Sequence, residues 1–106
     1  MSFRPQLLLV SAGFDAHEAD PLASMRMTAA GYARIIQRLR RASGEGAFAL
    51  VTEGGYDLPA LRECIEAAIA ATQADVAPVA SDGPAPRGQR ALETVRAAQS
   101  AFWRGL

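Results

Sequence analysis

Two continuous apolar runs constrain the fold of this chain more than any other feature. LLLV at 7–10 and AFALVT at 47–52 lack polar alternation, which is typical of strands buried on both faces in a parallel sheet. A segment of helical pattern follows each run. This order predicts an α/β fold with strands over 6–11 and 47–52, joined by a right-handed βαβ crossover in an open parallel sheet.

The ends of the expected helices carry recognisable signals. Thr28 is a suitable N-cap for a helix that ends near Ser43, ahead of two glycines. Asp57, with Pro59 in the next turn, predicts the start of a second helix. The expected core face of this second helix comprises Leu61, Ile65, Ala68 and Ile69.

The composition changes after the second helix. Residues 73–88 are rich in Pro, Ala, Gly and Asp, which predicts a linker or a wrapping loop. A final helix is expected over 89–103, within a C-terminal segment 89–106. We therefore expect three parts: an α/β portion over 1–72, the linker, and the C-terminal helix.

Charge and cysteine content exclude some classes of protein. Eleven basic residues, all Arg, balance eleven acidic ones, so a general electrostatic affinity for nucleic acid or anionic membrane is not expected. Cys64 has no internal disulfide partner and is expected to be a small buried hydrophobe. The first apolar run is too short for a signal peptide or a membrane span, so the expected location is the cytoplasm.

Chemistry-bearing residues follow both apolar runs. SAGFDAHEAD comes after the first and TEGGYD after the second. In parallel α/β sheets, ligands bind beyond the carboxyl ends of the strands. If the two strands are neighbours, the loops meet and six residues become candidates for one site: Asp15, His17, Asp20, Glu53, Tyr56 and Asp57.

Each candidate also has a purely structural interpretation. Asp15 suits hydrogen bonding to loop amides as well as metal binding, and a loop histidine such as His17 is more often exposed than a ligand. Asp20 precedes a proline, which is typical of a turn. Tyr56 is either a core aromatic or a hydroxyl directed at a substrate carbonyl. With one His and one Cys, the residues do not complete the three protein ligands of a catalytic zinc site.

Three motifs in sequence order resemble a known family. SAGFDAHEADPL at 11–22, MTAAGYARI at 27–35 and VTEGGYDLPAL at 51–61 are similar to the carboxyl-terminal part of the zinc-dependent histone deacetylase superfamily. That superfamily includes acetylpolyamine amidohydrolases and acetoin-utilization proteins. The resemblance covers about residues 3–72. It implies a fragment of an open parallel-sheet, arginase/deacetylase-like fold: βαβα plus a C-terminal helix.

The resemblance also implies roles for individual residues. Asp15 matches a zinc ligand of the family, and Tyr56 matches the tyrosine that polarises the scissile amide carbonyl. Gly54 and Gly55 match glycines that line the acyl-lysine tunnel. The family's zinc-binding histidine comes from an upstream segment, so His17 is not expected to be a ligand. Asp20 likewise matches a loop aspartate that binds no metal.

The family's histidine base and its two other zinc ligands lie upstream of these motifs. We therefore expect the C-terminal segment of a zinc-dependent deacetylase, whose intact form would use Zn²⁺ to remove acetyl or acyl groups from acetyl-lysine, polyamine or a similar amine. Alone, the segment is expected to be inactive and to lack tight zinc binding.

An alternative is a non-catalytic, truncated module that associates with another chain, or forms oligomers, through its exposed sheet edge. In that state, four side chains are expected to be left uncovered: Leu7, Leu9, Phe48 and Leu50.

Overall fold

The computed structural model describes residues 4–73, 78 and 83–103. The chain divides into two compact units, Pro5–Ala80 and a unit that contains the last helix. In sequence order the elements are β1 (Leu7–Ala12), α1 (Ala29–Ala42), β2 (Ala47–Thr52), α2 (Leu58–Ala71) and α3 (Pro86–Gln99).

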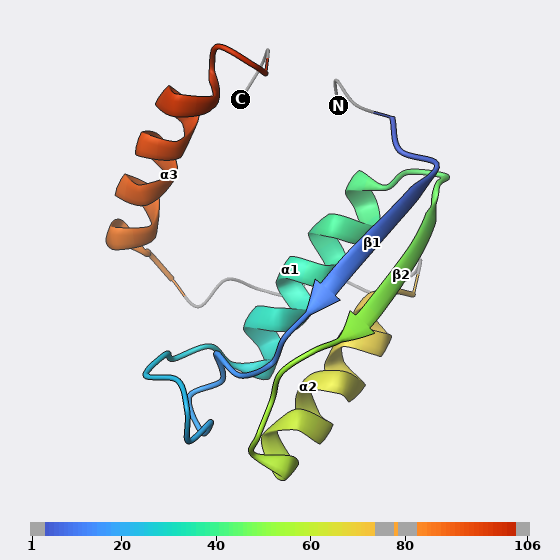
Figure 1. Ribbon diagram of the computed structural model, residues 1–106, viewed down its shortest axis with the longest axis vertical. Helices are drawn as coiled ribbons and strands as arrows, with labels where there is room; N and C mark the ends of the chain where they lie inside the picture. Colours follow the sequence, from blue (N-terminus) through green and yellow to red (C-terminus); the bar gives the residue numbers. More distant parts are fainter. Residues whose placement is uncertain (1–3, 74–77, 79–82, 104–106) are drawn as a thin grey trace. The chain divides into compact units, whose positions relative to one another are not determined.

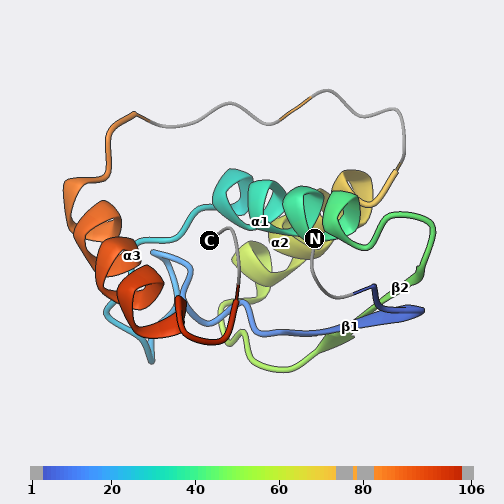
Figure 2. The same cartoon turned by 90° about the horizontal axis from the view of Figure 1, so that it is seen from above.

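β1 and β2 form a two-stranded parallel sheet. Their register runs from Leu7 opposite Ala47 to Ala12 opposite Thr52, and α1 provides the crossover between them. α1 and α2 pack against each other and lie on the same face of the sheet (Figures 1 and 2). The predicted strand–helix–strand–helix order and the parallel pairing are therefore confirmed.

Among the described residues, one face of the sheet is covered by helices and the other is open. Leu7 and Leu9 are 55% and 61% exposed on the open face, as expected for uncovered positions. The prediction that both faces are buried is wrong here. Phe48 and Leu50 were also expected to be uncovered, but they pack against the core. The register explains the difference, because it places Leu50 opposite Val10, on the helix side.

The core between the sheet and the two helices consists mostly of small residues. It comprises Ala12, Phe14, Ala29, Tyr32, Ala33, Ile36, Cys64, Ala68 and Ala71. Cys64 is fully buried, as predicted, and burial together with the nearby charge of Glu63 raises the pKa of its thiol. Ile69 was expected on the core face of α2 but is 57% exposed, because Ala68 and Ala71 occupy the inward positions.

The predicted caps of α1 and α2 are confirmed. The Thr28 hydroxyl accepts a hydrogen bond from the Gly31 N–H at 3.1 Å, and an Asp57 carboxylate oxygen accepts one from the Ala60 N–H at 2.9 Å. These bonds satisfy amide groups that the first turn of a helix leaves without a partner. Asp57 thereby also fixes the point at which the second loop ends.

The last helix starts earlier than predicted. α3 begins at Pro86 rather than Gln89, because proline is well accommodated in the first turn, where its missing N–H costs nothing. It ends at Gln99, and all its described side chains are exposed. Of the predicted linker, residues 74–77 and 79–82 lie outside the described residues.

Within the described ranges, no helix has both the length and the apolar character needed to cross a membrane.

Candidate functional site

The two loops that leave the carboxyl ends of β1 and β2 lie side by side (Figure 1). Backbone hydrogen bonds continue past the strands: the Glu53 N–H donates to the Ala12 carbonyl at 3.0 Å, and the Phe14 N–H donates to the Gly54 carbonyl at 2.7 Å. The strands are adjacent and parallel, so Asp15 and Tyr56 follow them at the same edge of the sheet. The expectation that the loops meet is confirmed.

The carboxylate of Asp15 lies against two glycines. A Cβ atom added to Gly54 would lie 2.8 Å from Asp15 Oδ2, and one added to Gly13 would lie 3.0 Å from Oδ1. The residue is partly buried, and within the described part of the chain no hydrogen bond to this carboxylate is found. A partly buried carboxylate whose oxygens accept no hydrogen bond from the described residues is suited to binding a cation.

His17 is buried and takes part in the structure of its own loop. Its Nδ1 accepts a hydrogen bond from the Ala19 N–H at 3.1 Å, and its backbone forms an isolated bridge with Met27. Within the described residues, no cluster of three or more His, Cys, Asp or Glu side chains could hold a metal ion. A metal centre at this edge would therefore need ligands beyond those described.

Asp20 connects the two loops directly. Its carboxylate is buried, with Oδ1 accepting from the Leu22 N–H and Oδ2 from the Tyr56 N–H, both at 2.9 Å. Burial by itself would raise the pKa of this carboxyl. Hydrogen bonds from backbone N–H groups of Tyr56, Leu22, Ala23 and Asp57 outweigh burial and hold the pKa below its usual value. The predicted turn is present, but the sequence carried no signal for the contact with Tyr56.

The glycine pair before Tyr56 is explained by close packing. Gly55 has φ +140°, and a Cβ atom there would lie 2.9 Å from Leu61 Cδ1 and 3.3 Å from Phe14 Cβ. Such a conformation strongly favours glycine. Tyr56 follows with its side chain 58% exposed. That Gly54 and Gly55 line a substrate tunnel stays a prediction, since both glycines already have a structural reason to lack a side chain.

Tyr32 of α1 contacts the loop that follows β1 through a hydrogen bond and a ring contact, a role that sequence analysis missed. Its hydroxyl accepts a hydrogen bond from the Ala16 N–H at 3.1 Å, and its ring meets Phe14 edge to face with centroids 5.0 Å apart. Burial is the main cause that raises the pKa of Tyr32, and the nearby charge of Asp15 adds to it. The sequence did carry a signal for this role: Tyr32 lies four residues after the predicted N-cap Thr28, on the expected core face of the helix.

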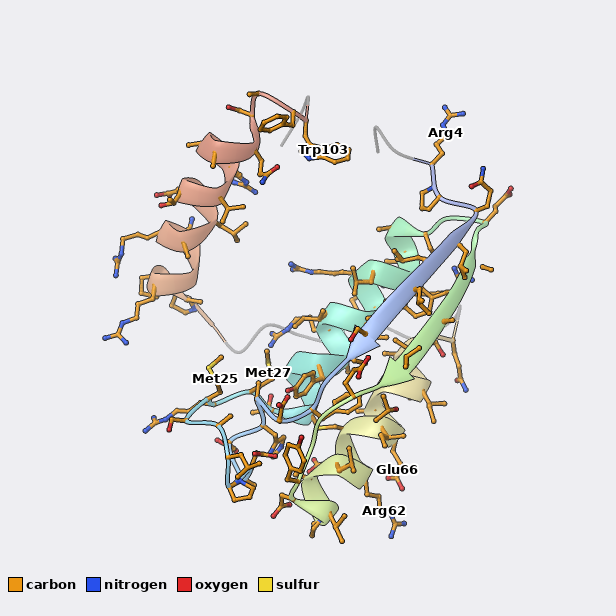
Figure 3. All side chains as sticks on the ribbon, in the orientation of Figure 1. Arg4, Met25, Met27, Arg62, Glu66 and Trp103 are labelled. Atoms are coloured by element: carbon orange, nitrogen blue, oxygen red, sulfur yellow. The ribbon has the colours of Figure 1, made fainter. Side chains whose placement is uncertain are left out.

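The two remaining candidates, Glu53 and Asp57, accept hydrogen bonds that have structural roles. A Glu53 carboxylate oxygen accepts a hydrogen bond from the Ser11 hydroxyl at 3.0 Å on the exposed side, and Asp57 caps α2. Farther along α2, Arg62 and Glu66 form an exposed ion pair at 2.9 Å (Figure 3). Of the six candidates, Asp15 has no hydrogen bond to its carboxylate among the described residues, Tyr56 is exposed, and Asp20 joins their loops.

Replacing Gly54 by Ala is expected to lower the free energy of unfolding by about 1–3 kcal/mol, because the new methyl group would overlap the Asp15 carboxylate. Urea unfolding monitored by circular dichroism measures the change. Gly88→Ala on α3 is the matched control: its Cβ would meet nothing closer than Ala85 Cβ at 3.8 Å, and it should be neutral or slightly stabilising. Equal stability of the two variants would show that Gly54 is not a close-approach position.

Comparison with known proteins identifies the family. The Histone deacetylase domain family matches residues 1–72, and the chain belongs to this family. Human polyamine deacetylase HDAC10 is 40% identical over 107 residues, covering 98% of this chain and 16% of the relative. Human histone deacetylase 7 is 38% identical over 108 residues, covering 95% of this chain and 11% of the relative.

Solved structures agree with this assignment. The crystal structure of the HDA15 HD domain superposes with a TM-score of 0.78 at 31% identity, covering 96% of this chain and 28% of that chain. The structure of the histone deacetylase Clr3 gives a TM-score of 0.80 at 28% identity, covering 97% and 17%. The fold is thus that of a deacetylase-domain fragment, and the chain spans less than a third of each of these relatives.

Proposed function

We propose that this segment contributes Asp15 and Tyr56 to the active site of a zinc-dependent deacetylase, an amide hydrolase that releases acetate from an acetylated amine. The observation that supports it most strongly is the connection between the two motif loops. Hydrogen bonds from the Phe14 N–H to the Gly54 carbonyl and from the Tyr56 N–H to Asp20 hold these loops together at one sheet edge. Membership of the histone deacetylase family supplies the reaction class.

In this proposal Asp15 provides one carboxylate ligand to zinc. Its partly buried carboxylate, placed against Gly13 and Gly54 and without a hydrogen bond among the described residues, fits that role. When bound, zinc supplies Lewis-acid polarisation of the amide carbonyl and activation of water. The described residues contain no group of three or more potential metal ligands, so further ligands and the general base would come from elsewhere in the enzyme.

Tyr56 has the complementary role in the proposed site. Its hydroxyl donates a hydrogen bond to the substrate carbonyl oxygen and binds it more strongly as negative charge develops there. Water attacks the carbonyl carbon, the carbon–nitrogen bond breaks, and the products are acetate and a free amine. The exposed side chain of Tyr56 is accessible to such a substrate.

For the substrate we propose an acetylated amine, either acetyl-lysine or a polyamine. The relatives include a polyamine deacetylase and a histone deacetylase, and these are the two classes that their names give. The zero formal net charge of this chain favours neither. We also propose a reducing, cytoplasmic setting, since Cys64 is a free thiol.

A graft into a relative tests this function. The segment of human HDAC10 that matches this chain would be replaced by residues 1–106, and hydrolysis of acetylated polyamine and acetyl-lysine peptides would be measured. We expect activity well above that of the same protein with the segment deleted. A folded, zinc-loaded graft without activity on either substrate would contradict the proposal.

A second candidate is a non-catalytic module that associates with another chain. The open face of the sheet favours it, because Leu7, Leu9 and Val51 are 55%, 61% and 45% exposed there. Each strand also has one edge without a pairing strand among the described residues. Exposed apolar strands of this kind promote association.

Light scattering of the 106-residue chain tests the second candidate. We expect a mass above that of the monomer at high concentration, and a shift toward monomer in Leu9→Glu. Leu58→Glu, at a 75% exposed position on α2, is the control and should leave the mass unchanged. A monomer at all concentrations would contradict association through this face.

A further inference from the structure

We propose that Asp20 is a positioning residue of this site: its carboxylate fixes the main chain at Tyr56 relative to the loop that carries Asp15. The proposal rests on the function proposed above, because it assigns Asp20 an effect on the reaction through Tyr56. In the proposed site, Asp20 touches neither the substrate nor the metal.

The two oxygens of the Asp20 carboxylate accept hydrogen bonds from different loops. Oδ1 accepts from the Leu22 N–H, within the loop after β1, and Oδ2 accepts from the Tyr56 N–H, in the loop after β2, each at 2.9 Å. The side chain is 7% exposed. Hydrogen bonds to an ionised carboxylate are stronger than those between neutral groups, so this is a firm connection between segments 36 residues apart.

The loop after β2 needs such a restraint. Gly54 and Gly55 precede Tyr56, and glycine gives the backbone the widest choice of conformations. The Phe14 N–H holds the first glycine through its carbonyl, at 2.7 Å. Asp20 holds the other end of the glycine pair, one residue before the Asp57 cap begins α2. Without Asp20, the Tyr56 hydroxyl would sample many positions relative to Asp15.

The chemistry of the site favours aspartate over asparagine. An ionised carboxylate can accept hydrogen bonds at both oxygens, whereas an asparagine amide accepts at its oxygen and donates at its nitrogen. In Asp20→Asn, the amide nitrogen would face the N–H of either Leu22 or Tyr56. The substitution keeps the size of the side chain while removing one of the two connections.

A double-mutant cycle in the grafted deacetylase tests the role. Asp20→Asn is expected to lower kcat by about 10–100-fold, as is typical when a group that orients an active-site residue is lost. If Asp20 acts through Tyr56, the same change in a Tyr56→Phe background should lower kcat no more than about twofold. Ser43→Ala is the control for general destabilisation, since its buried hydroxyl bonds to Arg40 at the other end of α1. The kcat of the Ser43→Ala variant should equal that of the unmodified graft.

Equal losses of kcat in the two backgrounds would overturn the proposal, because a purely structural role affects both alike. A second readout is the amide hydrogen exchange of Tyr56, measured by NMR on the 106-residue chain. We expect protection of this amide that is lost in Asp20→Asn while the amides of β1 stay protected. If Tyr56→Phe itself leaves kcat unchanged, the proposed function fails, and the exchange of the Tyr56 amide then decides on Asp20: continued protection in Asp20→Asn would overturn its role.

Discussion

Replacing Tyr56 by Phe in the grafted deacetylase is expected to lower kcat by about 10²–10³-fold, the usual cost of losing one donor to a developing oxyanion. The reason is that the hydroxyl contributes mainly in the transition state, where the carbonyl oxygen carries the most charge. Tyr56 is 58% exposed, so removing its hydroxyl should not weaken the core. Steady-state kinetics with an acetylated amine, together with zinc analysis, measures the effect.

The control is a second aromatic substitution outside the site. Trp103 lies in the C-terminal unit, away from both loops in sequence, and Trp103→Phe should change kcat by less than about twofold. Zinc content should be the same in both variants. If Tyr56→Phe kept the activity of the unmodified graft, Tyr56 would have no role in binding the carbonyl.

Replacing Phe14 by Ala is expected to lower the free energy of unfolding by about 3–5 kcal/mol. The ring is 4% exposed, packs edge to face on Tyr32, and lies beneath Gly55. Its removal would leave a cavity below both loops. Because small domains have only about 5–15 kcal/mol of stability, this loss would be a large part of the total.

Urea unfolding monitored by circular dichroism measures the effect of Phe14→Ala. Phe102→Ala is the control, since that ring is 78% exposed, and its effect should stay within about 0.5 kcal/mol. A Phe14→Ala variant as stable as Phe102→Ala would mean that the two loops do not share this core.

The sequence allowed the local elements to be predicted closely. β2 occupies the predicted residues, β1 is shifted by one residue, and α1 and α2 start at their predicted caps, Thr28 and Asp57. These features depend on neighbours in the sequence: apolar runs, capping side chains and prolines. α3 differs because Pro86 was assigned to the linker, although proline is common in the first turn of a helix.

Features that depend on distant residues were less predictable. The burial of Phe48 and Leu50 follows from the strand register, and a shift of one residue would have reversed it. The candidate site shows the same limit. Motifs were enough to propose Asp15 and Tyr56 as candidates, but the contact of Asp20 with Tyr56 joins residues that only the folded chain brings together. Among the described residues, no group of three or more His, Cys, Asp or Glu side chains could hold a metal ion, so these residues do not complete the proposed zinc site.

We propose that Asp15 of this chain binds the catalytic zinc of a deacetylase. The zinc affinity of the graft, measured by competition with a chelator, tests this role of Asp15. We predict one bound zinc in the unmodified graft and an affinity at least about 100-fold lower in Asp15→Asn, since even groups that only orient a ligand contribute 10–100-fold. Asp57→Asn, which retains a good helix cap, should bind zinc like the unmodified graft. Equal zinc affinity of Asp15→Asn and Asp57→Asn would contradict the claim.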